Sequence, residues 1–144
     1  MFKRVLSVLL IVMVFISGCA AKTSFDSPQT GATLNVKTGQ ATNLPREEEF
    51  NTTSFGNYEF MAEHPDYEPL YGILPLKFNG GYMALDILFF APALFFNLRE
   101  VFPYYEFDME KKVVQFKKEA NDPWQTYTPL DVETARAKRF FHKE

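Results

Sequence analysis

Cysteine and histidine are scarce in this chain, whose 144 residues contain one cysteine, Cys19, and two histidines, His64 and His142. A lone cysteine excludes an intramolecular disulfide, so the core alone must stabilise the fold. The two histidines stand far apart, no serine lies in a G-x-S-x-G context, and no glycine-rich phosphate loop occurs. The sequence therefore predicts a protein that is not an enzyme and that holds no metal and no diffusible cofactor.

One short stretch keeps an alternative open. His64 and the carboxylates of Asp66 and Glu68 lie close together in the sequence and could converge on a metal or serve an envelope hydrolase. A turn whose polar side chains face water explains the same residues equally well. The distance of His64 from the carboxylate oxygens is the discriminating observation, because a general base must reach its target directly or through one water.

What the chain does have is an export signal. Lys3 and Arg4 supply a basic start, and Val5 to Ile16 supply a run of 12 residues that are all apolar except Ser7. A secretory signal peptide has an apolar region of about 7–15 residues, whereas a transmembrane helix needs about 20. We therefore expect residues 1–18 to be a signal peptide.

The run ends in Ile16-Ser17-Gly18-Cys19, which resembles the lipobox of bacterial lipoproteins: an apolar residue, Ser or Ala, Gly or Ala, then Cys. The resemblance implies that the Cys19 thiol receives a diacylglyceryl group, that cleavage follows on its amino side, and that the new amino terminus is acylated too. Two or more acyl chains anchor a protein stably to a membrane. The alternative is an uncleaved anchor with an incidental cysteine.

The resemblance also implies a location. Ala20, directly after the lipidated cysteine, is similar to lipoproteins passed on to the outer membrane, so we expect the periplasmic face of the outer membrane rather than the inner membrane. Without residues 1–18, which hold two of the 15 basic residues and no acidic one, the formal net charge changes from −3 to −5. A net acidic chain argues against a nucleic-acid partner.

Periodicity divides the rest of the chain. Residues 19–30 are polar and small and predict a lipidated tether, whereas 31–127 predict a β-rich domain. Ala32, Leu34 and Val36 alternate with polar residues, as in a half-buried strand. Four further expectations follow: a loop with a poorly defined edge over 40–54, a strand over 58–64, a short or edge strand over 72–78, and a hairpin over 104–118.

Residues 128–144 predict a C-terminal helix. Thr128 can cap it, Pro129 suits the first helical position, and acidic residues near its start precede basic residues near its end, as the helix dipole favours. The expected apolar stripe consists of Leu130, Ala137 and Phe141.

The segment 82–103 is the most apolar part of the mature chain, and 14 of the 17 residues from 82 to 98 are apolar. A helix of that length would measure about 25 Å, which is short of the roughly 30 Å hydrocarbon core, so we reject a transmembrane span. A buried hairpin or two short helices broken at Pro92 remain open, as does a partner-facing or membrane-dipping element. The candidate interaction surface comprises Leu85, Leu88, Phe89, Leu94, Phe95, Phe102, Tyr104 and Tyr105.

A further resemblance covers about half of the mature chain. Ser27-Pro28 and Gly31-Ala32, then Phe55-Gly56-Asn57-Tyr58, then Asp66-Tyr67-Glu68-Pro69 look like the PEGA-type modules of bacterial surface proteins, although the Pro-Glu-Gly signature itself does not occur between residues 39 and 55. Such modules are small β-sandwiches related to the carboxypeptidase regulatory domain. The resemblance implies a non-catalytic binding or spacer unit.

Together these patterns predict a mainly β protein, a small β-sandwich with a hydrophobic insertion and a C-terminal α-helix, that is, a β-rich α+β fold. The expected function is that of a membrane-anchored envelope lipoprotein acting as a non-catalytic binding or structural module, with an envelope protein or the cell wall as partner. Two alternatives remain, an accessory subunit of a secretion or export assembly and an envelope hydrolase.

Overall fold

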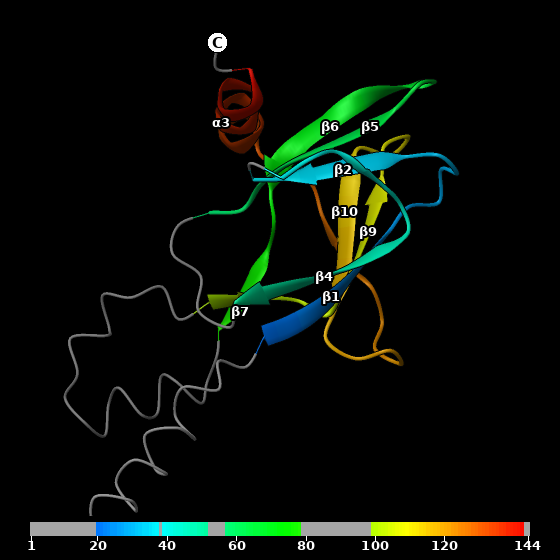
Figure 1. Cartoon of the computed structure of the whole chain (residues 1–144), viewed down its shortest axis with the longest axis vertical. Helices are drawn as coiled ribbons and strands as arrows, with labels where there is room; N and C mark the ends of the chain where they lie inside the picture. Colours follow the sequence, from blue (N-terminus) through cyan, green and yellow to red (C-terminus); the bar gives the residue numbers. More distant parts are fainter. Residues whose placement is uncertain (1–19, 38, 52–56, 79–98, 143–144) are drawn as a thin grey trace, which may run out of the picture.

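The chain folds into two β-sheets and one C-terminal helix (Figure 1). This computed structural model describes residues 20–37, 39–51, 57–78 and 99–142. The larger sheet has the strand order β11-β10-β9-β1-β4, the smaller one β3-β2-β5-β6, and β7 pairs with β8. The strands are β1 (Ala20–Asp26), β2 (Thr33–Val36), β3 (Thr42–Asn43), β4 (Arg46–Asn51), β5 (Glu59–His64), β6 (Tyr67–Ile73), β7 (Leu76–Phe78), β8 (Arg99–Val101), β9 (Tyr104–Asp108), β10 (Val113–Lys117) and β11 (Gln125–Tyr127). The predicted mainly β fold with a C-terminal helix is confirmed.

Aromatic side chains from both sheets meet in one core. Phe25 on β1 and Phe107 on β9 belong to the five-stranded sheet, and Phe60 on β5 belongs to the four-stranded sheet; all three are buried. The rings of Phe60 and Phe107 lie 5.1 Å apart, edge to face, which is a favourable geometry for aromatic pairs. The two sheets are therefore joined through the edge-on contact of Phe60 with Phe107.

The strands with clear alternation were predicted correctly. In β2, Leu34 and Val36 are buried, and in β5, Phe60 and Ala62 are buried. The hairpin predicted over 104–118 is β9 and β10, which pair antiparallel from Tyr104 opposite Lys117 to Asp108 opposite Val113. Period-2 burial against a core thus located these strands.

The predicted polar tether is wrong for the residues that the structure describes, because residues 20–26 form strand β1. This strand lies inside the five-stranded sheet, parallel to β9 and antiparallel to β4. Its inward positions include Thr23 and Phe25, both buried. Thr23 Oγ1 donates to the carbonyl of Phe102 at 3.1 Å, so a polar residue can occupy a core position there.

The predicted loop over 40–54 also contains strands, β3 and β4. Strand β4 pairs with β1 along its whole length and forms an edge of the five-stranded sheet. The run Glu47–Glu49 lies in this edge strand, where charge discourages pairing with a further strand. Its charged composition concealed the strand from a reading based on alternating apolar residues.

The edge position expected near residues 72–78 is confirmed for β6, although this strand begins earlier than expected. β6 is the edge strand of the four-stranded sheet, and an edge tolerates Pro69 because no partner strand needs its N–H. The shorter β7 pairs with β8 instead.

Helix α3 (Asp131–Phe141) begins later than predicted, after Leu130 rather than at Pro129. No side chain at Leu130 caps the helix; its backbone N–H instead donates to the Glu133 carboxylate at 2.9 Å. The predicted stripe holds for Ala137, which is fully buried, but not for Leu130, which is 60% exposed. The expected charge order, acidic at the start and basic at the end, is confirmed.

The helix is fixed to β5 and β6 by polar contacts. Thr134 Oγ1 donates to the carbonyl of Tyr71 at 3.2 Å, and Arg136 Nε donates to Glu59 Oε1 at 2.9 Å. Just before the helix, Pro129 approaches Gly72 on β6. The chain thus crosses from the five-stranded sheet to cover the four-stranded one.

Replacing Gly72 by alanine is expected to lower the free energy of unfolding by about 1–3 kcal/mol, as overpacking does. A Cβ at this position lies 2.8 Å from Cε1 of Phe60 and 2.9 Å from Cβ of Pro129. Urea unfolding of the Gly72→Ala variant measures the cost. The matched test is Phe60→Leu, alone and combined with Gly72→Ala. Because the smaller side chain leaves room for the added Cβ, the cost of the double variant is expected to be less than the sum of the two single costs. Full additivity would contradict a clash between the Cβ and the Phe60 ring.

Candidate functional site

Most of the predicted site residues lie outside the described residues. These are the predicted lipidation site Cys19 and the first five members of the predicted interaction surface, Leu85, Leu88, Phe89, Leu94 and Phe95. The structure describes the remaining three members, Phe102, Tyr104 and Tyr105.

Two of these three residues belong to the core, so their assignment to an interaction surface is wrong. Phe102 is buried and Tyr105 is only 1% exposed. The Tyr105 hydroxyl accepts from the Phe102 N–H at 2.9 Å and donates to the Pro75 carbonyl. Burial raises the pKa of Tyr105, so the hydroxyl stays a donor. The corner between β8 and β9 therefore folds inward.

Tyr104 lies on the opposite face of β9, in a small aromatic and basic cluster. Lys117 Nζ is 5.4 Å from the centre of the Tyr104 ring and 4.4 Å from that of Trp124. Trp124 is 39% exposed, and Lys117 also donates to the Ala120 carbonyl at 2.6 Å. Such cation–π contacts hold the loop between β10 and β11 against the sheet. The register of the predicted hairpin places Lys117 opposite Tyr104 and could have predicted this contact. No local sequence pattern predicts that Trp124 joins the cluster.

His64 engages both ring nitrogens with backbone groups, Nδ1 within its own turn and Nε2 with a residue that is distant in the sequence. The Asp66 N–H donates to Nδ1 at 3.2 Å, which leaves Nε2 to donate to the Thr30 carbonyl at 3.1 Å. Asp66 Oδ2 is 3.9 Å from Nδ1 on a largely exposed side chain, and the Glu68 carboxylate accepts from Lys112, which lowers its pKa. No group of three acidic, histidine or cysteine residues in the described ranges is arranged to hold a metal ion. The backbone contacts match the turn interpretation, whereas the 3.9 Å separation of Nδ1 and Oδ2 keeps the hydrolase alternative open.

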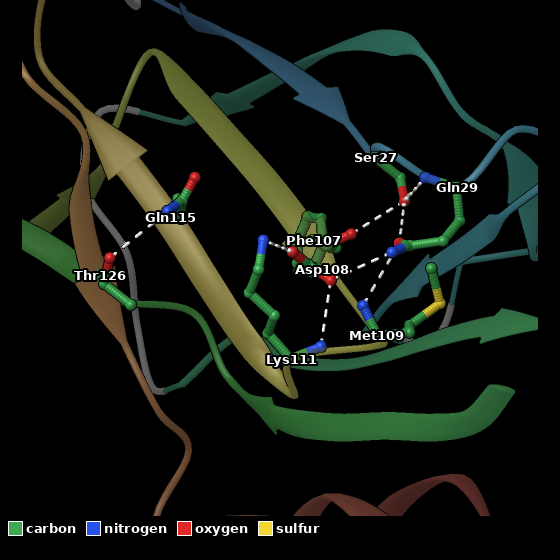
Figure 2. Close-up of polar contacts among 8 residues, drawn as sticks. All are labelled: Ser27, Gln29, Phe107, Asp108, Met109, Lys111, Gln115 and Thr126. Atoms are coloured by element: carbon green, nitrogen blue, oxygen red, sulfur yellow. Dashed lines mark hydrogen bonds and ion pairs between the residues drawn. The ribbon is translucent and has the colours of Figure 1, made fainter.

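A polar network that the sequence analysis missed joins the turn after β1 to the turn between β9 and β10 (Figure 2). Ser27 Oγ lies 3.0 Å from Gln29 Oε1 and 2.8 Å from the Phe107 carbonyl. Gln29 Nε2 donates to Asp108 Oδ1 at 3.0 Å. The backbone N–H and the ammonium of Lys111 donate to Asp108 at 3.1 and 2.7 Å.

Charge in this network is controlled by its hydrogen bonds. Burial of Asp108 disfavours its carboxylate, but the hydrogen bonds from Lys111 and Gln29 outweigh burial and lower its pKa. Glu106, on the same strand, has its pKa raised by burial and then by the nearby Asp26 and Asp108. An Asp in a predicted hairpin turn is an ordinary surface residue by pattern, so only the packed turns reveal its burial.

The polar contacts of the C-terminal helix are also structural. Glu59 is buried and accepts from Arg136, and the Tyr71 hydroxyl lies 2.9 Å from Nε2 of His142. Burial, followed by the charge of Glu63, raises the pKa of Tyr71. These contacts hold α3 against the sheet. Glu59 and His142 therefore serve to pack the helix.

The end of the molecule at which β1 begins is the remaining feature of functional interest. In Figure 1 the start of β1, the end of β4 and β7 lie together, away from α3. Within the described ranges, no helix has both the length and the apolar character needed to cross a membrane. No family model, curated protein or solved structure matches this chain.

Proposed function

We propose that this protein is a bacterial envelope lipoprotein, anchored by a covalent lipid on Cys19, whose folded part acts as a non-catalytic binding or structural module. The carrying observation is the sequence Ile16-Ser17-Gly18-Cys19, which precedes strand β1 without any intervening residue. The lipid provides the attachment. The β-sandwich provides the rigid body that is attached.

The geometry of the polar side chains supports the non-catalytic role. His64 has both ring nitrogens engaged with backbone groups, and the buried carboxylates of Glu59 and Asp108 are held by Arg136 and Lys111. A general base needs a free lone pair directed at a substrate. The resemblance to PEGA-type modules, itself still a prediction, points to the same kind of role.

The proposed location is the periplasmic face of the outer membrane, on the basis of Ala20 after the lipidated cysteine. The proposed partner is an envelope protein or the cell wall, and the net negative charge of the mature chain disfavours nucleic acid. The apolar residues between 82 and 98 remain the predicted contact region.

Replacing Cys19 by alanine is expected to abolish membrane attachment, because Cys19 has the only thiol of the chain that can carry the diacylglyceryl group. Ser17→Ala is the matched control, since the lipobox accepts Ser or Ala at that position, and it is expected to remain in the membrane fraction. Cell fractionation and the mass of the amino-terminal peptide measure both outcomes. Membrane attachment of an unlipidated Cys19→Ala protein would instead support the uncleaved anchor.

Crosslinking in intact cells tests the role of the attached module. A partner recovered with wild type and with Ser17→Ala, but reduced with Cys19→Ala, supports a binding function at the membrane. Stoichiometric copurification with an envelope assembly would favour the accessory-subunit alternative. Hydrolysis of an envelope polymer by the purified protein would contradict the proposal.

A further inference from the structure

The distance between the proposed lipid and the folded domain is very short. Strand β1 begins at Ala20, one residue after Cys19, and consecutive α-carbons are about 3.8 Å apart. β1 is paired to β4 from Ala20 onward and to β9 from Ser24 onward. Within the described residues, no unpaired stretch therefore separates the sheet from a lipid on Cys19.

Several strand ends lie beside the start of β1. Ala20 pairs with Asn51 at the end of β4, and β8 contacts both β1 and β4. Phe78 at the end of β7 pairs with Arg99 at the start of β8. The segment that follows Phe78 and precedes Arg99 is the most apolar part of the mature sequence, so both of its connections to the domain are at this end.

Two pairs of oppositely charged residues lie at this end, one joined by an ion pair and one placed opposite by the strand register. Lys77 Nζ is 3.0 Å from Glu100 Oε1, and Lys22 on β1 lies directly across from Glu49 on β4. Zwitterionic lipid headgroups present the same mixture of charges, and a balanced surface avoids repulsion from an anionic leaflet. We call the end defined by Lys22, Glu49, Lys77 and Glu100 the β1 end.

We propose that the β1 end is a membrane-contact surface that rests directly on the phospholipid headgroups of the leaflet holding the lipid anchor. This inference depends on the proposed lipidation of Cys19. The headgroup region is only about 5–8 Å thick on each side of the bilayer, so a strand starting next to the lipidated residue begins within that region. The absence of a tether, and not an affinity of the surface itself, enforces the contact.

The strand register fixes the orientation of the domain. Ser24 on β1 pairs with Tyr104 on the parallel strand β9, so Lys22 lies two positions before that row and Asp108 four positions after it. Six positions of about 3.3 Å place Asp108, where the β9–β10 turn begins, about 20 Å farther along the strand direction than Lys22. The β9–β10 turn is therefore expected to face away from the membrane.

A single-thiol experiment tests this orientation. When Cys19 carries lipid, an engineered cysteine is the only free thiol, so Lys22→Cys and Glu110→Cys can each be labelled with one fluorophore. Both residues are exposed. In vesicles of phosphatidylethanolamine and phosphatidylglycerol with spin-labelled headgroups, we expect quenching at position 22 to be several-fold stronger than at position 110. Glu49→Cys, on the neighbouring strand, is expected to behave like Lys22→Cys and serves if that variant folds poorly.

A spacer variant separates the tether argument from the anchor itself. Twelve Gly and Ser residues inserted between Cys19 and Ala20 span about 19 Å on average. The lipidated variant is expected to float with vesicles as wild type does, while quenching at position 22 falls to the level at position 110. Equal quenching at positions 22 and 110 in a protein that floats overturns the orientation, and strong quenching at position 22 despite the spacer overturns the role of the missing tether. A wild-type protein that carries no lipid refutes the proposed function instead.

Discussion

Replacing Phe107 by alanine is expected to lower the free energy of unfolding by about 3–5 kcal/mol, the usual cost of removing a buried phenylalanine. Phe107 has no exposed surface. Its ring lies 5.1 Å from Phe60 on the other sheet and 6.0 Å from Phe25 on its own sheet. The substitution removes the ring that joins the two sheets and leaves a cavity that neither sheet can close.

Urea unfolding of residues 20–144, followed by far-ultraviolet circular dichroism, measures this cost. Domains of this size have total stabilities of about 5–15 kcal/mol, so the variant is expected to be partly unfolded at low denaturant. Val132→Ala is the control, because this side chain is 71% exposed on the same protein and its truncation is expected to cost under about 0.5 kcal/mol. A Phe107→Ala cost as small as the control would contradict a shared core between the sheets.

Replacing Asp108 by asparagine is expected to cost about 2–3 kcal/mol at pH 7, because hydrogen bonds to a charged acceptor are the strong ones. The Asp108 side chain is buried and accepts from Gln29 and twice from Lys111. Asparagine keeps the shape but removes the negative charge and replaces one of the two accepting oxygens by an NH₂ group, which cannot accept. The turns after β1 and between β9 and β10 are therefore expected to separate more easily.

The difference between wild type and Asp108→Asn is expected to depend on pH. The pKa of Asp108 is lower in the folded protein than its ordinary value, which is about 3.9 in the unfolded chain. The stabilisation is thus fully present above about pH 4 and is lost as pH falls through the lower folded-state pKa. The raised pKa of Glu106 has the opposite effect on the pH dependence of stability. Because Glu106 occurs in both proteins, its contribution largely cancels in the difference between them.

Denaturant unfolding between pH 7 and pH 3 measures this dependence. Lys111→Met is the matched control, since it removes only the ammonium of a largely exposed side chain and keeps the backbone donor; its expected cost is under about 1 kcal/mol. A difference for Asp108→Asn that stays constant down to pH 3 would show that the carboxylate charge is not what stabilises the turns.

The sequence predicted strands wherever apolar residues alternate at a core. Strands β2, β5, β9 and β10 were found in this way because their inward residues are large and their outward residues are polar. Strand β1 was missed because Thr23 replaces an apolar residue at a buried position and its hydroxyl is satisfied by the Phe102 carbonyl. Strand β4 was missed because an edge strand with three consecutive glutamates has no such alternation.

The candidate site residues show the same division. A run of aromatic residues indicates either burial in the core or contact with a partner, and the run itself does not distinguish the two. The folded corner between β8 and β9 places Phe102 and Tyr105 in the core. His64 and its neighbouring carboxylates are compatible with a metal by composition. Their arrangement depends on the Thr30 carbonyl, which is distant in the sequence and which the tertiary structure brings to Nε2.

The sequence by itself determined the mainly β class, the C-terminal helix and the expectation of an exported, lipid-anchored protein, because periodicity and signal motifs are local properties of the chain. Only the tertiary structure decided that residues 20–26 form a paired strand, that Asp108 is buried, and that the strand ends around Ala20 lie together at one end of the sandwich. Each of these depends on a partner far away along the chain, and long-range pairing leaves no mark in a local pattern.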